Sequence, residues 1–253
     1  MNLSAWRYRL ILDQYGGPLS EIALRPASRG QPGFEASAHL CLKYKPYQRT
    51  SHHLYGSCDG SGTSLFQYEA TAKAVSEALE RWAFYESSDS QHKTRLGFDI
   101  DGSTSGMAAY PALTSGPARN KARLEAIERW ALCQWWAGNT RTQPLTHDVL
   151  PPHTQGFKIV VPWHRTHVVV LFSRASRSGP MAFGFSAETS LAAAIDHASV
   201  ELLRNVSVLA AITAAPAAAL NTPLKYSTAA LDLYERRLLY FSGEGFHLFS
   251  ERL

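Results

Sequence analysis

The sequence predicts a mixed α/β fold, in which strands and helices are layered around one core and a loop–helix unit is used more than once. Segments rich in β-branched and aromatic residues alternate with segments that have the 3.6-residue apolar period of helices. One helical stretch recurs almost unchanged. The 253 residues, 45% of them hydrophobic, supply one sizeable core or two small ones. We expect a single domain over residues 1–253.

The sequence of residues 73–83 recurs at residues 121–131. Eight of the eleven positions are identical at a constant offset of 48, whereas chance matching would give about one identity. An Asp-Gly-Ser tripeptide within a glycine- and serine-rich segment precedes each copy, at residues 59–61 and 101–103. The sequence therefore predicts a loop followed by a helix, used twice.

Both copies are predicted to be helices because their apolar residues have the i, i+3, i+4, i+7 spacing of a buried stripe. Trp82 and its counterpart Trp130 are expected in the core. A capping box formed by Ser64 and Gln67 marks the first helix start, and Ser115 with Pro117 marks the second. A charged stripe runs beside each apolar stripe; it consists of Lys73, Glu77 and Glu80 in the first copy and Lys121, Glu125 and Glu128 in the second.

A third, more diverged helix is expected over residues 188–209, after a turn at residues 184–186. Its Glu201 and Arg204 take the places of the paired glutamates, so one carboxylate is kept and the other is replaced by a cation. A hairpin is predicted between the second and third helices, with strands at residues 157–161 and 166–172. Further strands are predicted at residues 6–12 and 39–44, a connector at 210–219 and a last helix at 229–241.

Composition argues against several classes of protein. The 25 basic and 21 acidic residues give a net charge of only +4, and the basic residues are scattered, so nucleic acid is not an expected partner. The three cysteines form no CxxC pair, which fits a reducing compartment and no thiolate zinc site. No signal peptide or membrane span is recognisable. We expect a cytoplasmic protein with no membrane partner.

Paired acidic helices suit a hard cation. Magnesium takes oxygen ligands and is commonly held by a few carboxylates together with nucleotide phosphates. If the two helices face each other, their glutamates can hold such ions, while Arg81 or Arg129 meets phosphate oxygens or supports the carboxylates. The preceding segments would add backbone N–H groups and hydroxyls for an anion. The metal-binding candidates are Glu77, Glu80, Glu125 and Glu128.

A simpler reading of each acidic stripe is a solvated helix face with an i,i+4 ion pair, which would contribute about 0.3–0.5 kcal/mol. The repeat favours function, since a solvent-exposed face places no demand on matching residues, although recent duplication would also produce identity. No other catalytic set competes. The glycine pair at residues 60–63 is not a Walker loop, because no Gly-Lys-Ser/Thr follows it, and the histidines lack metal-site partners.

These residues resemble the YcaO family of ATP-dependent peptide-modifying enzymes. The glycine-rich residues 60–63 followed by Ala-x-x-Lys-Ala-x-x-Glu-x-x-Glu-Arg at residues 70–81 resemble the first family motif. Residues 103–109 with Glu-x-x-Glu-Arg-Trp-Ala at residues 125–131 and the later tryptophan pair at 135–136 resemble the second. Phe-Gly-Phe-Ser at residues 183–186 with Ala-x-x-Glu at residues 198–201 resembles the third family motif. The match covers about residues 50–210, in the family order.

The resemblance implies a YcaO-like domain whose repeated loop–helix units pack on β-sheet around an ATP cleft. It implies ATP and Mg²⁺ as cofactors and a ribosomal precursor peptide as substrate. A nucleophile adds to a backbone amide carbon, the amide oxygen takes the γ-phosphoryl group, and phosphate leaves. The product is an azoline, a thioamide or an amidine. Carried over by position, the four glutamates hold magnesium; the nucleotide-binding candidates are Ser61, Gly62, Thr63, Arg81, Ser105, Arg129, Glu201 and Arg204.

Two hypotheses for the activity stay open. The first is an amide-activating enzyme that works with a leader-binding, TfuA-like or dehydrogenase partner protein; a homodimer is also left open. The second is a shortened, non-catalytic YcaO-like protein that binds a peptide or regulates a full-length enzyme. Retention of all four glutamates favours the first. The second is favoured because residues 249–253 show no proline-rich tail of the kind typical of azoline-forming members. The catalytic base is not identified.

Overall fold

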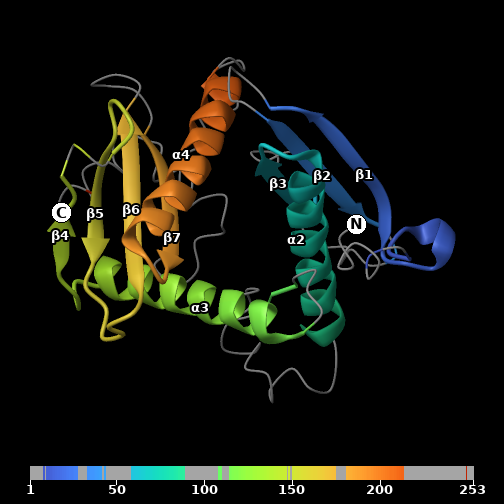
Figure 1. Cartoon of the computed structure of the whole chain (residues 1–253), viewed down its shortest axis with the longest axis horizontal. Helices are drawn as coiled ribbons and strands as arrows, with labels where there is room; N and C mark the ends of the chain where they lie inside the picture. Colours follow the sequence, from blue (N-terminus) through green and yellow to red (C-terminus); the bar gives the residue numbers. More distant parts are fainter. Residues whose placement is uncertain are drawn as a thin grey trace, which may run out of the picture. The chain divides into compact units, whose positions relative to one another are not determined.

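The computed structural model contains two compact units, Met1–Ala126 and Ile127–Leu253, each with its own sheet and helix layer (Figure 1). It describes residues 8, 10–27, 33–41, 43, 58–88, 108–109, 114–146, 148, 150–174, 181–213 and 249. The helix α3 (Gly116–Trp136) begins in the first unit and ends in the second. A single domain over residues 1–253 stays a prediction.

The first unit is an antiparallel three-stranded sheet covered by one helix. After a short 3₁₀ turn, η1 (Asp13–Tyr15), the strands β1 (Leu19–Pro26), β2 (Phe34–Leu40) and β3 (Gly60–Ser64) lie in that order. The helix α2 (Gln67–Ser88) follows β3 directly and packs on the sheet. Alternate residues of β2 face this helix, as period-two side chains must. The core consists of Leu19, Ala36, Ala38, Leu40, Ala70, Ala74, Val75 and Ala78.

The second unit is an antiparallel four-stranded sheet, in the order β4 (Thr142–Pro144), β5 (Gln155–Ile159), β6 (His167–Arg174) and β7 (Met181–Glu188). The helix α4 (Leu191–Thr213) packs on β6 and β7. An aromatic cluster receives one side chain from each of β5, β6 and β7 and includes Trp135 near the end of α3 and the fully buried Phe249. The other members of this cluster are Phe157, Phe172 and Phe183.

The two units share one building block, an edge strand followed by a helix that packs very close to it. A Cβ added to Gly60 of β3 would collide with the carbonyl oxygen of Ala74 on α2. A Cβ added to Gly184 of β7 would collide in the same way with the carbonyl of Ala198 on α4. Both pairs are separated by 14 residues, so the two blocks correspond at a constant offset of 124. Glycine is required at these two points because the helix backbone occupies the side-chain position.

Much of the predicted element order is confirmed. The chain is mixed α/β, the three repeat helices are present as α2, α3 and α4, and the predicted hairpin is the antiparallel β5–β6 pair, with Ile159 opposite Val168. Within the part of the chain that the structure describes, no helix is long and apolar enough to cross a membrane. The last predicted helix, residues 229–241, lies outside the described residues.

Several expected boundaries are wrong. Of the strand predicted at residues 39–44, only residues 39–40 belong to β2. The strand predicted at residues 6–12 is not formed where it is described, since Leu12 makes only an isolated bridge to Leu19. The predicted connector at 210–219 begins too early, because α4 continues to Thr213. The glycine-rich segments at residues 60–63 and 184–186 are strands rather than loops or turns, because each pairs along a sheet edge and packs beneath a helix.

Two predicted side-chain roles also need correction. Ser64 does not form a capping box with Gln67; its hydroxyl donates to Glu69 Oε2 at 2.6 Å and accepts from the Phe66 N–H at 3.3 Å. Trp130 is not a core residue, because it is 39% exposed and stacks edge-on against Trp163 with ring centroids 5.0 Å apart. Its counterpart Trp82 does pack against the core of the first unit.

Candidate functional site

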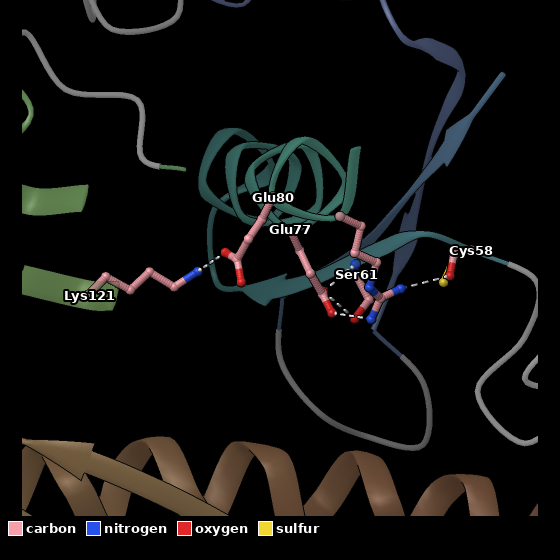
Figure 2. Close-up of polar contacts among 6 residues, drawn as sticks. Cys58, Ser61, Glu77, Glu80 and Lys121 are labelled. Carbon is pink, nitrogen blue, oxygen red and sulfur yellow. Dashed lines mark hydrogen bonds and ion pairs between the residues drawn. The ribbon is translucent and has the colours of Figure 1, made fainter. Parts of the chain in front are cut away.

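Glu77 ties helix α2 to the edge of strand β3. Its Oε2 accepts the Ser61 backbone N–H at 2.7 Å and the Ser61 hydroxyl at 3.2 Å (Figure 2). Its Oε1 accepts from Arg81, one helical turn later, at 2.8 Å. Arg81 also donates to the Cys58 carbonyl oxygen at 3.4 Å. Both oxygens of this carboxylate are therefore engaged, and the negative charge of Glu77 is balanced by a guanidinium.

Glu80, one turn along the same stripe, lies in a different environment. Its side chain is only 6% exposed. Burial raises the pKa of Glu80 to about 7, the ammonium group of Lys121 opposes this shift, and the negative charges of Glu125 and Glu77 add to it. An ionised carboxylate that is buried near two others is unfavourable unless a cation is close.

The cation beside Glu80 comes from helix α3. Lys121 Nζ lies 3.4 Å from Glu80 Oε2, and Figure 2 shows the lysine reaching toward α2. The first turns of α3 thus bring Lys121 and Glu125 to the acidic stripe of α2 within the first unit. This unit gathers three of the four predicted magnesium ligands, namely Glu77, Glu80 and Glu125. Among the described residues, no three acidic, histidine or cysteine side chains form a ready-made metal site.

The electrostatics of this region nevertheless suit a divalent cation. The charges of Glu125 and Glu77 act on Glu80, which is removed from solvent and has a raised pKa. Carboxylate oxygens are the donors that Mg²⁺ takes, usually together with water and phosphate oxygens. Charge on a bound cation would offset the burial and the weaker repulsion that now disfavour ionised Glu80. The donor set therefore fits Mg²⁺, and its ligation by Glu77, Glu80 and Glu125 stays a prediction.

The second unit repeats the strand-edge contact. The Phe185 N–H of β7 donates to Glu201 Oε2 of α4 at 2.7 Å. Donor and acceptor are 16 residues apart, as Ser61 and Glu77 are. At the same offset of 124, Arg204 corresponds to Glu80 and Asn205 corresponds to Arg81. Asn205 is buried and its amide donates to the Phe183 carbonyl oxygen, which again fixes the helix to its edge strand.

Glu128 holds the same strand from another helix. Its Oε2 accepts the Ala187 N–H at 3.1 Å, so two outward N–H groups of β7, those of Phe185 and Ala187, both donate to glutamates. Strand edges leave such groups unpaired unless something covers them. Glu128, the fourth predicted magnesium ligand, thus has a defined contact within the second unit. Its role as a ligand stays a prediction.

The predicted nucleotide-binding residues are only partly as expected. Ser61, Gly62 and Thr63 do not form an open loop of donors, because β3 pairs with β2 and the Ser61 N–H is given to Glu77. The Thr63 carbonyl accepts from Lys73 Nζ at 3.1 Å. Arg129 is half-buried on α3, and Ser105 lies outside the described residues. Nucleotide binding by these residues and by Arg81, Glu201 and Arg204 stays a prediction.

Sequence reasoning missed the partners of the acidic residues. It listed Lys121 as part of a stripe without assigning it to Glu80, and it gave no role to Ala187. One signal was available, since the spacing from Gly60 to Glu77 equals that from Gly184 to Glu201. That equality identifies Glu77 and Glu201 as equivalent contacts to an edge strand. No sequence signal pairs Lys121 with Glu80, because the contact joins two helices 41 residues apart.

No protein-family model matches the chain, and no curated protein matches it in sequence. Solved structures do match in fold. A YcaO from Methanopyrus kandleri, solved bound with AMPPCP and Mg²⁺, aligns with a TM-score of 0.56 at 15% identity, over 83% of this chain and 67% of that one. A heterocyclase in complex with substrate and cofactor aligns with a TM-score of 0.51 at 12% identity, over 90% of this chain. This chain spans 41% of the heterocyclase. The YcaO-like fold inferred from the motifs is confirmed.

Proposed function

We propose that this protein uses ATP and Mg²⁺ to activate a backbone amide of a ribosomally made peptide. The observation that carries the proposal is the buried Glu80, set among other carboxylates on a YcaO-like fold. The fold similarity supports the nucleotide, since the Methanopyrus kandleri protein was solved with AMPPCP, an ATP analogue, and Mg²⁺. The heterocyclase, solved with substrate, supports peptide modification as the class of reaction.

The chemistry needs little from the protein beyond positioning and charge. A nucleophile adds to the amide carbon and loses its proton, the amide oxygen takes the γ-phosphoryl group of ATP, and that oxygen leaves as phosphate with ADP as the other product. Phosphoryl transfer of this kind is catalysed by orientation and by neutralisation of the phosphate charge. In the proposal Glu77, Glu80, Glu125 and Glu128 hold magnesium. Arg81 orients Glu77, and Arg81, Arg129 and Arg204 are the proposed cations for phosphate oxygens.

The peptide is proposed to reach this site with the help of a second protein, of the leader-binding, TfuA-like or dehydrogenase class. Azoline formation, thioamidation and amidine formation share the same activated amide and differ in the nucleophile. The mass of the product therefore separates sulfur transfer from dehydration: replacement of oxygen by sulfur indicates a thioamide, whereas loss of water indicates an azoline or an amidine formed within the peptide.

Glu128→Gln tests the proposal most directly. Glutamine keeps the size and helix propensity of glutamate, and its amide oxygen can still accept the Ala187 N–H, but one negative charge is removed. We expect ATP-dependent peptide modification to fall by at least about 100-fold, because preorganised charge supplies much of such catalysis. The assay is peptide mass together with phosphate release, with the native partner present.

Glu86→Gln is the matched control, since Glu86 is an exposed residue of α2 and should leave the rate unchanged. A Glu128→Gln protein that modifies its peptide at the wild-type rate would overturn the catalytic role of the acidic helices. Peptide binding without any modification by the wild-type protein would favour the non-catalytic hypothesis.

A further inference from the structure

The contact between Lys121 and Glu80 differs from the other ion pair of the acidic stripe. Arg81 approaches Glu77 to 2.8 Å, whereas Lys121 Nζ stays 3.4 Å from Glu80 Oε2. Charge-assisted bonds between a nitrogen cation and a carboxylate are usually about 2.7–2.9 Å long. The guanidinium is thus bound tightly to its carboxylate, while the ammonium group is held more loosely.

Exposure separates the two partners of this contact. The Glu80 side chain is 6% exposed, and the Lys121 side chain is 46% exposed. The carboxylate is fixed inside the unit, but the ammonium sits on a long flexible stem that reaches it from the solvent side. The Lys121 ammonium group can therefore leave the contact and move into water, whereas the Glu80 carboxylate stays buried. A group with these properties can neutralise a buried carboxylate and still be displaced.

The repeat supplies a comparison for this lysine. Lys73 stands at the equivalent position of the first copy, 48 residues earlier. Its Nζ donates to the Thr63 carbonyl oxygen at 3.1 Å, and within the described part of the chain no carboxylate accepts from it. A lysine at this position of the repeat thus has two different partners in the two helices. The contact with a buried carboxylate belongs to Lys121.

We propose that Lys121 is a built-in counter-cation of the acidic site: its ammonium group neutralises Glu80 while no metal is bound, and a divalent cation that binds Glu80 displaces it. The inference rests on the proposed function, since it assigns to Lys121 control over the same cation. An ammonium group and a divalent cation at one carboxylate repel each other. Lys121 therefore lowers the affinity for metal and prevents the empty site from carrying an unbalanced charge.

Manganese binding without nucleotide tests this directly. Mn²⁺ alone is titrated into the full chain, and free Mn²⁺ is measured by electron paramagnetic resonance. In Lys121→Met we expect the dissociation constant to fall roughly three- to ten-fold, because a positive charge a few ångströms from the ion is removed. Lys73→Met should bind Mn²⁺ like the wild type, and so should Lys121→Arg. Lys121→Gln replaces the methionine variant if that variant does not fold.

A second readout is the rise in Tm on adding Mg²⁺, which should be larger in Lys121→Met than in the wild type. Equal or weaker Mn²⁺ binding by Lys121→Met, beside a wild type that binds, would overturn the role of Lys121 and leave the metal site standing. An equal gain in Lys73→Met would also overturn it, since any lysine nearby would then act alike. Absence of Mn²⁺ binding in every variant would overturn the metal site itself.

Discussion

Two glutamates three residues apart on one helix show how the surroundings decide what a carboxylate can do. Glu77 has a backbone N–H, a hydroxyl and a guanidinium around it, so its charge is satisfied by the fold. Glu80 is buried and faces a loosely held ammonium group. In the metal-free protein Glu77 therefore ties the helix to the strand. An added cation would therefore change the local energy more at Glu80 than at Glu77.

The raised pKa of Glu80 makes a prediction about stability. The folded state holds this proton more tightly than the unfolded chain, whose pKa is near 4.5. The contribution of Glu80 to the free energy of unfolding is fully present below pH 4.5. It is lost as the pH rises to the folded-state pKa of about 7. Glu80→Gln cannot ionise. Its free energy of unfolding, relative to the wild type, should therefore increase between pH 5 and pH 8, by on the order of 2 kcal/mol.

Urea unfolding of the metal-free protein at several pH values measures this difference. Glu86→Gln is again the control on the same helix, because an exposed side chain should give a difference that does not change with pH. A Glu80→Gln difference that is flat from pH 5 to pH 8 would show that Glu80 is not destabilised by ionisation. The pH at which the rise levels off reports the pKa of Glu80 in the folded state.

At the scale of single elements, helices were easier to predict than strands. The helices α2 and α3 have a strong apolar period and repeat each other, so both were located from the sequence. Alanine and serine make up three of the seven residues of β2, and glycine and serine make up four of the five residues of β3; these residue types have little intrinsic preference for strands. In β3 the glycines are needed because α2 packs so close that a larger side chain would not fit. That requirement comes from tertiary packing and is not visible in a local window.

Close packing of helix on strand predicts the effect of adding one methyl group. Gly60→Ala and Gly184→Ala should each lower the free energy of unfolding by about 2–4 kcal/mol, because the new Cβ meets a helix backbone that has no room to move. Gly116→Ala is the control. Its Cβ would lie 3.7 Å from Thr114 Oγ1, an ordinary contact at the start of α3, so we expect no loss of stability.

Chemical denaturation of the three variants tests whether close packing of the helix requires glycine at these positions. If Gly184→Ala is as stable as the wild type, the close approach of α4 to β7 is not a constraint on the sequence. The equivalence of the two blocks would then lose its main support. Equal losses in Gly60→Ala and Gly184→Ala would establish that both blocks depend on the same contact.

Over the whole molecule, the same block is used twice with different charges. In the first unit it carries Glu80 beside Glu77; in the second it carries Arg204 beside Glu201. The two carboxylates of the first block thus suit a bound cation, whereas the second block carries the positive charge of Arg204. The sequence already showed these residue types and their order. Their ties to the edge strands and the counter-charge of Lys121 depend on contacts between distant segments, so only the structure could supply them.

An acidic region of this kind should make ATP binding depend on magnesium. Arg81 already balances Glu77, but the triphosphate repels Glu80 and Glu125 when they are ionised, and a single lysine cannot offset that repulsion. We expect calorimetric titration with ATP to give an affinity at least about ten-fold higher with Mg²⁺ than with excess chelator. In Glu80→Gln this ratio should shrink, since one repelling charge is gone and one ligand for the ion is lost. Glu86→Gln should keep the wild-type ratio. Equal affinity for ATP with Mg²⁺ and with chelator in the wild type would mean that the nucleotide does not meet these carboxylates, and the assignment of the acidic helices to a metal–nucleotide site would have to be given up.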